Sequence, residues 1–480
     1  MAEHALSTSV HTPIPEVGSP EESRLDRIGI PHALRWGFLG LLLIMTAVGL
    51  ESNFLEPHMS QVLDVSGTTV AAIVTWHNLA VAVGSYLGGA LADLFGPKRI
   101  MVLGAAIWVV FHAVFLLALN TGSMELAAAA YFARGFGFPL FAFAFIVWIA
   151  AVAPQQRRST AIGWFYVMYT GGLPTLGSLI AIGAIPTFGG GGVGGAGETG
   201  AMWLAAGIAV AGFLIAHFGV RETRGTRRLA PAHETVGQVL TAGIRLTATN
   251  RKILMGFLIR LINTAPQFGM FIVLPAVWTA DAVWGHGWSQ SQYLAMTVAV
   301  YATNILVNAV FGAIGDRWGW RRTVKWFGIT GSAVGLLVWW YMPYLVPTDT
   351  TWGYVLAVAA GCVFGCLLAG FVPMGAIMPA LTPEHKGAAM AMYTTAAGGA
   401  IFLGTAVVWL VRQFSELSGL DLADDAFLIN SIIVWAFVGL YACAWVMINF
   451  LRVPEDEQKE KYGKLFGRRE VSLEEESAHV

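Results

Sequence analysis

Charged residues are scarce in this chain. Asp, Glu, Lys and Arg make up 12% of its 480 residues, whereas apolar residues make up 56%, and the mean hydropathy is +0.64. A typical soluble domain is about 25% charged. Because so few charges cannot cover the surface of a water-soluble globule of this size, the composition excludes an ordinary soluble protein and favours a chain that lies in lipid.

Cysteine is also rare, and the charges nearly cancel. Of the three cysteines, Cys362 and Cys366 lie four residues apart in an apolar run, where a metal or redox site would need further ligands that the neighbouring sequence lacks. We therefore expect no metal and no cofactor. The net charge of -1 does not indicate a nucleic-acid partner, and residues 1–30 lack the apolar core of a cleavable signal peptide.

Long apolar runs fill most of the chain. A helix that spans a bilayer needs about 20 mostly apolar residues, and in lipid each backbone polar group must be paired within the segment. The runs are longer than the roughly 10 residues of a barrel strand, so the sequence predicts an all-α membrane protein with twelve transmembrane helices. The expected helices are 35–58, 67–92, 98–119, 124–152, 158–185, 200–219, 253–280, 289–315, 323–345, 352–380, 387–412 and 427–451.

Lysine and arginine are distributed unevenly among the loops. Every second loop is basic, and by the positive-inside rule these loops are cytoplasmic. This predicts an even helix count, both termini in the cytoplasm and a location in a bacterial inner membrane, with Arg412 as the one departure from the pattern. The loops without Lys or Arg are 59–66, 120–123, 186–199, 281–288 and 346–351.

The longest basic segment divides the chain into six helices plus six. We expect one six-helix bundle on each side of this segment and a polar tail at each end of the chain. We also expect one copy of the chain to form the transporter. The predicted units are the cytoplasmic tail 1–34, the N-terminal bundle 35–219, the central loop 220–252, the C-terminal bundle 253–452 and the cytoplasmic tail 453–480.

A short motif occurs twice, at corresponding places after the second and the eighth helix. Both copies read G-x-[LI]-x-D-x-x-G-x-[KR]-R. The glycine lets one helix approach its neighbour closely, and the aspartate and the basic pair lie at helix ends, where charges interact with the helix dipole. The motif residues are Gly89, Asp93, Gly96, Lys98 and Arg99 in the first copy and Gly312, Asp316, Gly319, Arg321 and Arg322 in the second.

This paired motif resembles the signature loop of the major facilitator superfamily. The resemblance implies two pseudo-symmetric six-helix bundles that transport a small molecule by alternating access, with these loops latching the halves together in the outward-facing state. Leu94 stands where the superfamily often has arginine, whereas the second copy keeps Arg317. We therefore expect the second loop to have the fuller charge network.

Three further segments, 131–148, 164–177 and 260–275, look like the polyol permease branch, the proton-linked ribitol and arabinitol transporters. This resemblance implies proton-coupled uptake of a sugar alcohol or a related small polar metabolite. Two other transport functions stay open. A proton-driven drug or metabolite exporter is one, and an organic-acid permease is the other, although the latter would need more than one cation in its cavity. The spans contain no cluster of nucleophile and base or of metal ligands, so we do not expect an enzyme.

Ionisable residues inside a membrane are costly and usually functional. Counting 1.5 Å per residue places Glu51 about 23 Å from the inner end of its helix and Arg134 about 15 Å from the outer end of its own. Sugar-transporting relatives in the superfamily set a first-helix acid against a fourth-helix arginine, which implies proton coupling by Glu51 and Arg134; a structural ion pair is the alternative. His77 is a third candidate because it can titrate near neutral pH, and His112 is expected to be structural.

Polar side chains at helical spacing should face a cavity or a neighbouring helix. An uncharged polyol would suit amides and aromatic rings, although bonds between helices would explain the same pattern. Arg260, near the start of the seventh helix, could extend to the cytoplasm. The expected substrate-binding residues are Asn263 and Gln267 on the seventh helix, Asn304 and Asn308 on the eighth, and Trp164, Tyr166 and Thr170 on the fifth.

Overall fold

Helices build the whole fold, and no strand occurs in the part of the chain that the computed structural model describes. Almost all the long helices are strongly apolar, as expected of segments that pair their own backbone groups in lipid. The described residues are 22–453 without Asn53, Ser66, 191–192, 231–233, 279–284, 289, 348 and 422–423.

The N-terminal half follows the predicted order of spans. Several spans consist of two or three helical pieces in sequence. In chain order the elements are α1 (Arg24–Arg27), η1 (His32–Leu34), α2 (Arg35–Glu51), α3 (Leu55–Leu63), α4 (Gly67–Phe95), α5 (Pro97–Asn120), α6 (Met124–Arg134), α7 (Gly137–Val152), η2 (Gln155–Arg157), α8 (Arg158–Thr170), η3 (Gly171–Leu176), α9 (Gly177–Thr187), α10 (Ala196–Leu214) and η4 (Ile215–Gly219).

The central segment contains η5 (Thr223–Thr226) and the helix α11 (Val236–Thr249). The C-terminal half then continues with α12 (Arg251–Trp278), α13 (Gln290–Trp318), α14 (Trp320–Thr323), η6 (Val324–Gly331), α15 (Ser332–Leu345), α16 (Thr351–Leu368), η7 (Ala369–Phe371), α17 (Met374–Leu381), η8 (Pro383–His385), α18 (Lys386–Leu417) and α19 (Ala426–Phe450).

Ten helical segments of the described chain are long and apolar enough to cross a membrane. The other two predicted runs form α12 and the α14–η6–α15 segment, which are helical and pack among the rest. The structure therefore has helix at each of the twelve predicted runs.

Two predicted helices end or break next to candidate site residues, and a third, 352–380, is interrupted at residues 372–373. The first was expected to continue to residue 58, but α2 ends at Glu51 and the chain turns into α3. The expected helix 124–152 breaks between Arg134 and Gly137. A Cβ on Gly137 would lie 2.5 Å from the Cβ of Trp108, so the backbone of α7 packs directly on α5. Both breaks place Glu51 and Arg134 at helix ends.

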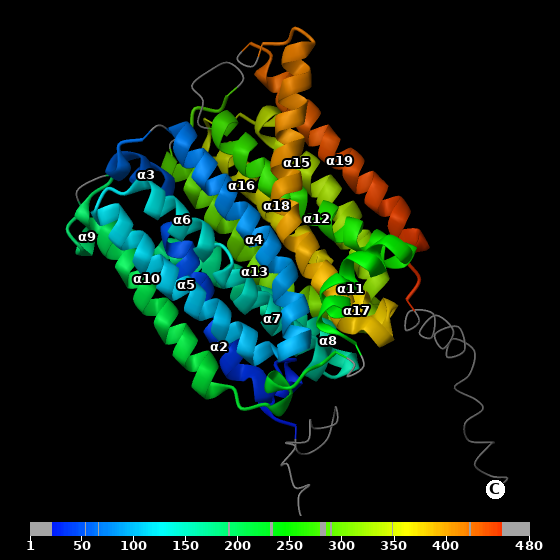
Figure 1. The fold of residues 1–480 in the computed structure, drawn as a ribbon. Helices are drawn as coiled ribbons and strands as arrows, with labels where there is room; N and C mark the ends of the chain where they lie inside the picture. Colours follow the sequence, from blue (N-terminus) through cyan, green and yellow to red (C-terminus); the bar gives the residue numbers. More distant parts are fainter. Residues whose placement is uncertain are drawn as a thin grey trace, which may run out of the picture.

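The two halves lie side by side and meet along two seams. In Figure 1, α2, α5 and α10 lie on one side of the molecule and α15 and α19 on the other, with α4 and α13 between them. One seam joins α4 to α18, and the other joins α8 to α13. The exact boundaries of the two bundles stay a prediction.

Glycines of the repeated motif allow the helix backbones to approach each other closely at both seams. A Cβ on Gly89 of α4 would lie 2.6 Å from the Cα of Ala391 in α18, and one on Gly312 of α13 would lie 2.7 Å from the carbonyl oxygen of Ser159 in α8. Small residues allow backbones to approach in this way. The repeated motif therefore brings the same kind of contact to each seam.

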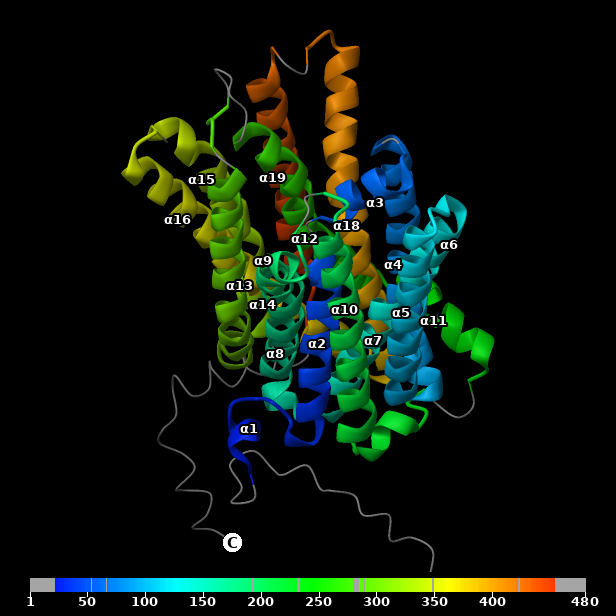
Figure 2. The ribbon, with the colours of Figure 1, turned by 90° about the vertical axis from the view of Figure 1, so that its left-hand side faces the viewer.

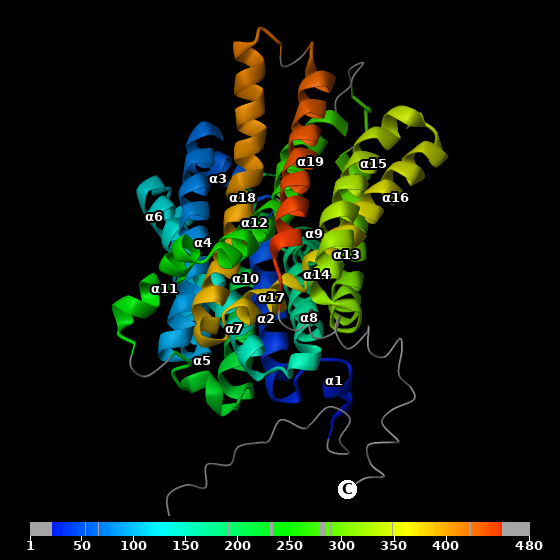
Figure 3. The same cartoon turned by 90° about the vertical axis from the view of Figure 1, so that its right-hand side faces the viewer.

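Both ends of the described chain lie at one end of the bundle. Figures 2 and 3 show α1 at the lower end, and the chain leaves α19 toward the same side. We call this end the termini face and the other the opposite face. The two motif loops, which follow α4 and α13, lie on the termini face, so any contact that they make between the halves closes this end.

Candidate functional site

The second motif loop joins the two halves through Asp316. Its carboxylate accepts hydrogen bonds from the Thr160 amide at 2.9 Å, the Thr160 hydroxyl at 2.7 Å, the Ser159 amide at 3.3 Å and the Trp320 indole at 2.9 Å. Ser159 and Thr160 are in the first turn of α8, where unpaired amides and the helix dipole favour a negative charge. An acid of the C-terminal half therefore holds a helix of the N-terminal half.

The first motif loop makes the reciprocal contact. Asp93, which is buried, lies against Gly387 in the first turn of α18, where a side chain would collide with the carboxylate. Within the described residues, no hydrogen bond reaches this carboxylate, whereas the Asp93 carbonyl accepts the amides of Leu229 at 2.9 Å and Ala230 at 3.0 Å. An acid of the N-terminal half thus faces a helix start of the C-terminal half.

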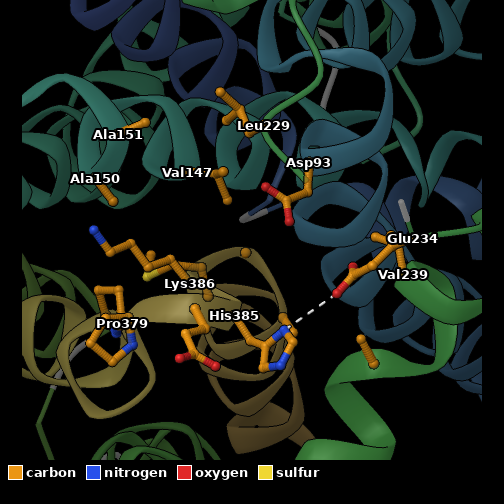
Figure 4. A pocket seen from close by; sticks show the side chains of 16 residues that line it. Asp93, Val147, Ala150, Ala151, Leu229, Glu234, Val239, Pro379, His385 and Lys386 are labelled. Carbon is orange, nitrogen blue, oxygen red and sulfur yellow. Dashed lines mark ion pairs between the residues drawn. The ribbon is translucent and has the colours of Figure 1, made fainter. Parts of the chain in front are cut away.

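Figure 4 shows Asp93 pointing into a pocket of about 280 Å³ between the halves, with Glu234 and His385 on its other sides. The Nδ1 atom of His385 lies 3.5 Å from Oε1 of Glu234, so the central segment also touches the start of α18. These contacts, together with those of Asp316, close the termini face.

The remaining motif residues have varied surroundings. Gly96 and Gly319 have φ angles of 89° and 113°, a backbone conformation that glycine adopts without strain, and each starts the next helix. Lys98 Nζ donates to the Val220 carbonyl at 2.6 Å, which ties α5 to the central segment. Three motif arginines, Arg99, Arg317 and Arg322, are exposed, and Arg321 is half-buried.

A buried charge cluster lies in the N-terminal half, where α2, α5 and α6 meet. Oε1 of Glu51 is 2.5 Å from Nη2 of Arg134, and the two residues are 3% and 2% exposed. Nη1 of Arg134 donates to Nδ1 of His112 at 2.5 Å, and Nε2 of His112 donates to the Met202 carbonyl at 3.0 Å. His112 is therefore the neutral tautomer that accepts at Nδ1. Its Nδ1 also lies 3.7 Å from Oε2 of Glu51.

His112 was expected to be structural, and it lies inside this cluster, bonded to Arg134 and to the Met202 carbonyl. Residue counting gave depths for Glu51 and Arg134, but nothing in the sequence shows which face of α5 turns toward them. The Trp108 ring, one turn earlier, stacks on His112 with centroids 4.5 Å apart.

Aromatic rings enclose the arginine of the cluster. The Arg134 guanidinium lies 4.5 Å from the Tyr131 centroid, 5.2 Å from Phe115 and 5.4 Å from Trp108. His77 stacks on Tyr131 at 4.0 Å and donates from Nδ1 to the Tyr131 carbonyl at 2.8 Å. The Tyr131 ring therefore lies between His77 and the Glu51–Arg134 ion pair.

A cavity of about 190 Å³ lies between the two halves. It is lined by aromatic rings, hydroxyls and amides from both halves, which suits a small polar solute. Five of the seven expected substrate-binding residues line it: Tyr166, Thr170, Gln267, Asn304 and Asn308. Side chains that the sequence did not single out include Ser85, Thr264 and Phe371.

The other two expected residues point elsewhere. Asn263 donates to the Gly328 carbonyl of η6 and its own carbonyl accepts the Tyr441 hydroxyl at 3.0 Å, so it joins helices inside the C-terminal half. The Trp164 indole donates to the Ile28 carbonyl at 2.8 Å, on the termini face. Neither residue lines the cavity, because the Asn263 amide nitrogen and the Trp164 indole are directed to backbone carbonyls of neighbouring segments.

Arg260 also differs from expectation, since it lies in the cavity and does not extend toward the cytoplasm. It is 3% exposed, donates to the Thr264 hydroxyl at 2.8 Å and the Tyr166 hydroxyl at 3.2 Å, and lies 4.3 Å from the Phe371 centroid. The Tyr166 hydroxyl is 2.7 Å from that of Tyr393, so this network also crosses between the halves.

Comparison with known proteins agrees with this architecture. The sequence profile of the Major Facilitator Superfamily matches residues 37–405. The chain is 31% identical to the D-arabinitol transporter of Klebsiella pneumoniae, over 89% of this chain and 94% of that one. It is 30% identical to the alpha-ketoglutarate permease of Bacillus subtilis, over 90% and 92% of the two chains.

A solved structure of the proton:xylose symporter XylE has a TM-score of 0.65 at 16% identity, covering 88% of this chain and 95% of that one, which confirms the predicted fold. The match to the D-arabinitol transporter confirms the resemblance to the polyol permease branch. The chain therefore belongs to the Major Facilitator Superfamily, and it is a multi-pass membrane transporter rather than an enzyme.

Proposed function

We propose that this transporter takes up a sugar alcohol or a related small polar metabolite together with a proton, by alternating access. The observation that carries the proposal is the cavity between the halves, where hydroxyl and amide side chains stand among aromatic and aliphatic ones, closed toward the termini face by the contacts of Asp93 and Asp316. The D-arabinitol transporter among its relatives supports a polyol, and the alpha-ketoglutarate permease supports a related polar metabolite.

We propose the buried Glu51–Arg134 pair as the coupling site. A carboxylate in a nearly dry site binds a proton more readily, whereas a neighbouring arginine favours the ionised form. Because these effects oppose each other, a small change in the distance between α2 and α6 can load or release the proton. His112 and His77 are positioning residues that hold Arg134 and its ring cage.

We also propose that the termini face is cytoplasmic and that the membrane is a bacterial inner membrane. The exposed arginines Arg221, Arg224 and Arg227 of the central segment lie on this face, in line with the positive-inside rule. A cysteine placed at Gly190, labelled with a membrane-impermeant reagent, should react from outside the cell; labelling solely from the cytoplasm would contradict this orientation.

Counterflow in proteoliposomes tests the transport function. Vesicles loaded with unlabelled ribitol, arabinitol or a related metabolite should accumulate the labelled compound transiently, because exchange needs no energy source. Empty vesicles and vesicles loaded with lactose serve as controls. Absence of counterflow across polyols, their acids and small organic acids would contradict the proposal.

A further inference from the structure

One positive charge stands in the central cavity without a negative partner. Among the described residues that line the cavity, Arg260 is the charged one, and the others are aromatic, aliphatic, hydroxyl or amide side chains. No acidic residue lines the cavity in the described part of the chain. An empty cavity therefore has a net charge of about one unit from this guanidinium.

The partners of Arg260 stabilise the cation without neutralising it. They are the hydroxyls of Thr264 and Tyr166 and the rings of Phe371 and Tyr393. Arg134, which is also deeply buried, has the carboxylate of Glu51 at 2.5 Å. Burying an unpaired charge is strongly unfavourable, so a residue in the position of Arg260 calls for an anion from outside the protein.

The shape of the guanidinium limits what that anion can be. Arginine presents a planar fork of N–H donors that matches the two oxygens of a carboxylate. The Nε atom of Arg260 is buried and has no hydrogen-bond partner among the described residues. The rest of the cavity, with Gln267, Asn304 and the Thr170 hydroxyl, offers hydrogen bonds suited to a hydroxylated chain.

We propose that the substrate is a polyhydroxy acid with a single carboxylate, for which one cation suffices, with that carboxylate on Arg260 and its hydroxyls on Gln267, Asn304 and Thr170. This inference rests on the proposed transport function and narrows its substrate class. It has an electrical consequence. A monoanion that enters with one proton moves no net charge, whereas a neutral polyol that enters with one proton moves one positive charge per cycle.

Two matched ligand pairs test the inference: ribonate with ribitol, and glycerate with glycerol. The members of each pair differ in one terminal group, a carboxylate in place of a hydroxymethyl. Isothermal titration of the purified transporter should show that ribonate binds at least about tenfold more tightly than ribitol. Removal of one partner from a buried charged pair costs at least about thirtyfold in affinity, so Arg260→Gln should weaken ribonate binding by that factor and change ribitol binding by less than about threefold.

Arg260→Lys provides a second variant in case the glutamine variant does not fold. It keeps the charge and loses the fork, and should give an intermediate affinity for ribonate. Arg412→Gln, which removes a cation from the far end of α18, should leave the preference between the ligands unchanged. In proteoliposomes, uptake of the acid should produce no current on a solid-supported membrane.

Equal or tighter binding of the neutral ligands, no binding of either acid, or an unchanged ligand preference in Arg260→Gln would overturn the inference. These outcomes differ from failure of the proposed function. If the acids bind through Arg260 but a pH gradient drives no accumulation, proton coupling is refuted and the assignment of Arg260 stands. If accumulation follows the pH gradient for ribitol alone, the coupling stands and the polyhydroxy acid is refuted.

Discussion

Replacing Glu51 by glutamine should abolish accumulation of substrate driven by a pH gradient and leave counterflow exchange intact. Glutamine has the shape of the protonated acid and can still accept a hydrogen bond from Arg134, whose Nη2 is 2.5 Å from Oε1 of Glu51. The variant therefore resembles a carrier that always holds its proton. Such a carrier can move loaded in both directions, but it cannot release the proton and return.

The expected effect is large. A gradient of one pH unit supports up to about tenfold accumulation for one proton per substrate, since about 1.4 kcal/mol corresponds to a factor of ten. Uptake into proteoliposomes should reach this level with the natural sequence and stop at about equal concentrations inside and outside with Glu51→Gln.

Glu198→Gln is the matched control. Glu198 is also a buried glutamate with a histidine partner, His58, at 2.7 Å, but it lies at the start of α10, outside the cluster. Its variant should still concentrate substrate. If Glu51→Gln concentrates substrate with a normal pH dependence, the assignment is wrong, and His77 is the next residue to replace.

Replacing Asp316 by asparagine should open the termini face. The carboxylate accepts four hydrogen bonds, three of them from the start of α8, and bonds to a charged group are about twice as strong as neutral ones. Asparagine removes the charge and turns one acceptor into a donor facing N–H groups. We expect a loss of about 2 kcal/mol, or roughly a thirtyfold shift in the ratio of closed to open molecules.

Cysteine accessibility measures this shift. In a background without the three native cysteines, a cysteine at Ala397, which lines the cavity, should react faster in Asp316→Asn with a membrane-impermeant thiol reagent applied from the termini face. Asp93→Asn should produce a smaller increase, because no hydrogen bond reaches the Asp93 carboxylate within the described residues. Asp349→Asn, an exposed aspartate before α16, should produce none. Equal labelling in all three variants would show that Asp316 does not hold the halves together.

The sequence predicted the helices well because lipid imposes a simple rule. Each run of apolar residues must pair its own backbone groups, so hydropathy alone located a helix at each expected run. The early end of α2 and the break after Arg134 could not be read in this way. At the break after Arg134, the backbone of Gly137 packs directly on Trp108 of α5, which is a contact between distant segments.

The parts of the candidate site that depend on position along a single helix could be predicted from the sequence. The parts that depend on packing between helices could not. Residue counting placed Glu51 and Arg134 at similar depths, and they are in contact. Counting also set Asn263 and Gln267 on one side of α12, yet Gln267 lines the cavity and Asn263 bonds to Gly328. One helical turn separates them, and the packing of η6 and α19 against α12 decides which one reaches the cavity.

Arg260 shows the same limit most clearly. Its position near the start of a helix suggested a side chain that extends to water, but Tyr166 of the other half and Tyr393 of α18 lie against it and it is buried. A depth counted along one helix cannot show how far the neighbouring helices extend.

Proton movement driven by substrate is the most direct test of proton coupling in this transporter. Proteoliposomes with equal pH on both sides and a trapped pH indicator receive substrate on the outside, at the concentration that gives half-maximal counterflow. We expect acidification of the lumen with the natural sequence, and none with Glu51→Gln although exchange continues. If substrate enters the natural transporter at full rate and the lumen pH does not change, the chain does not couple transport to protons.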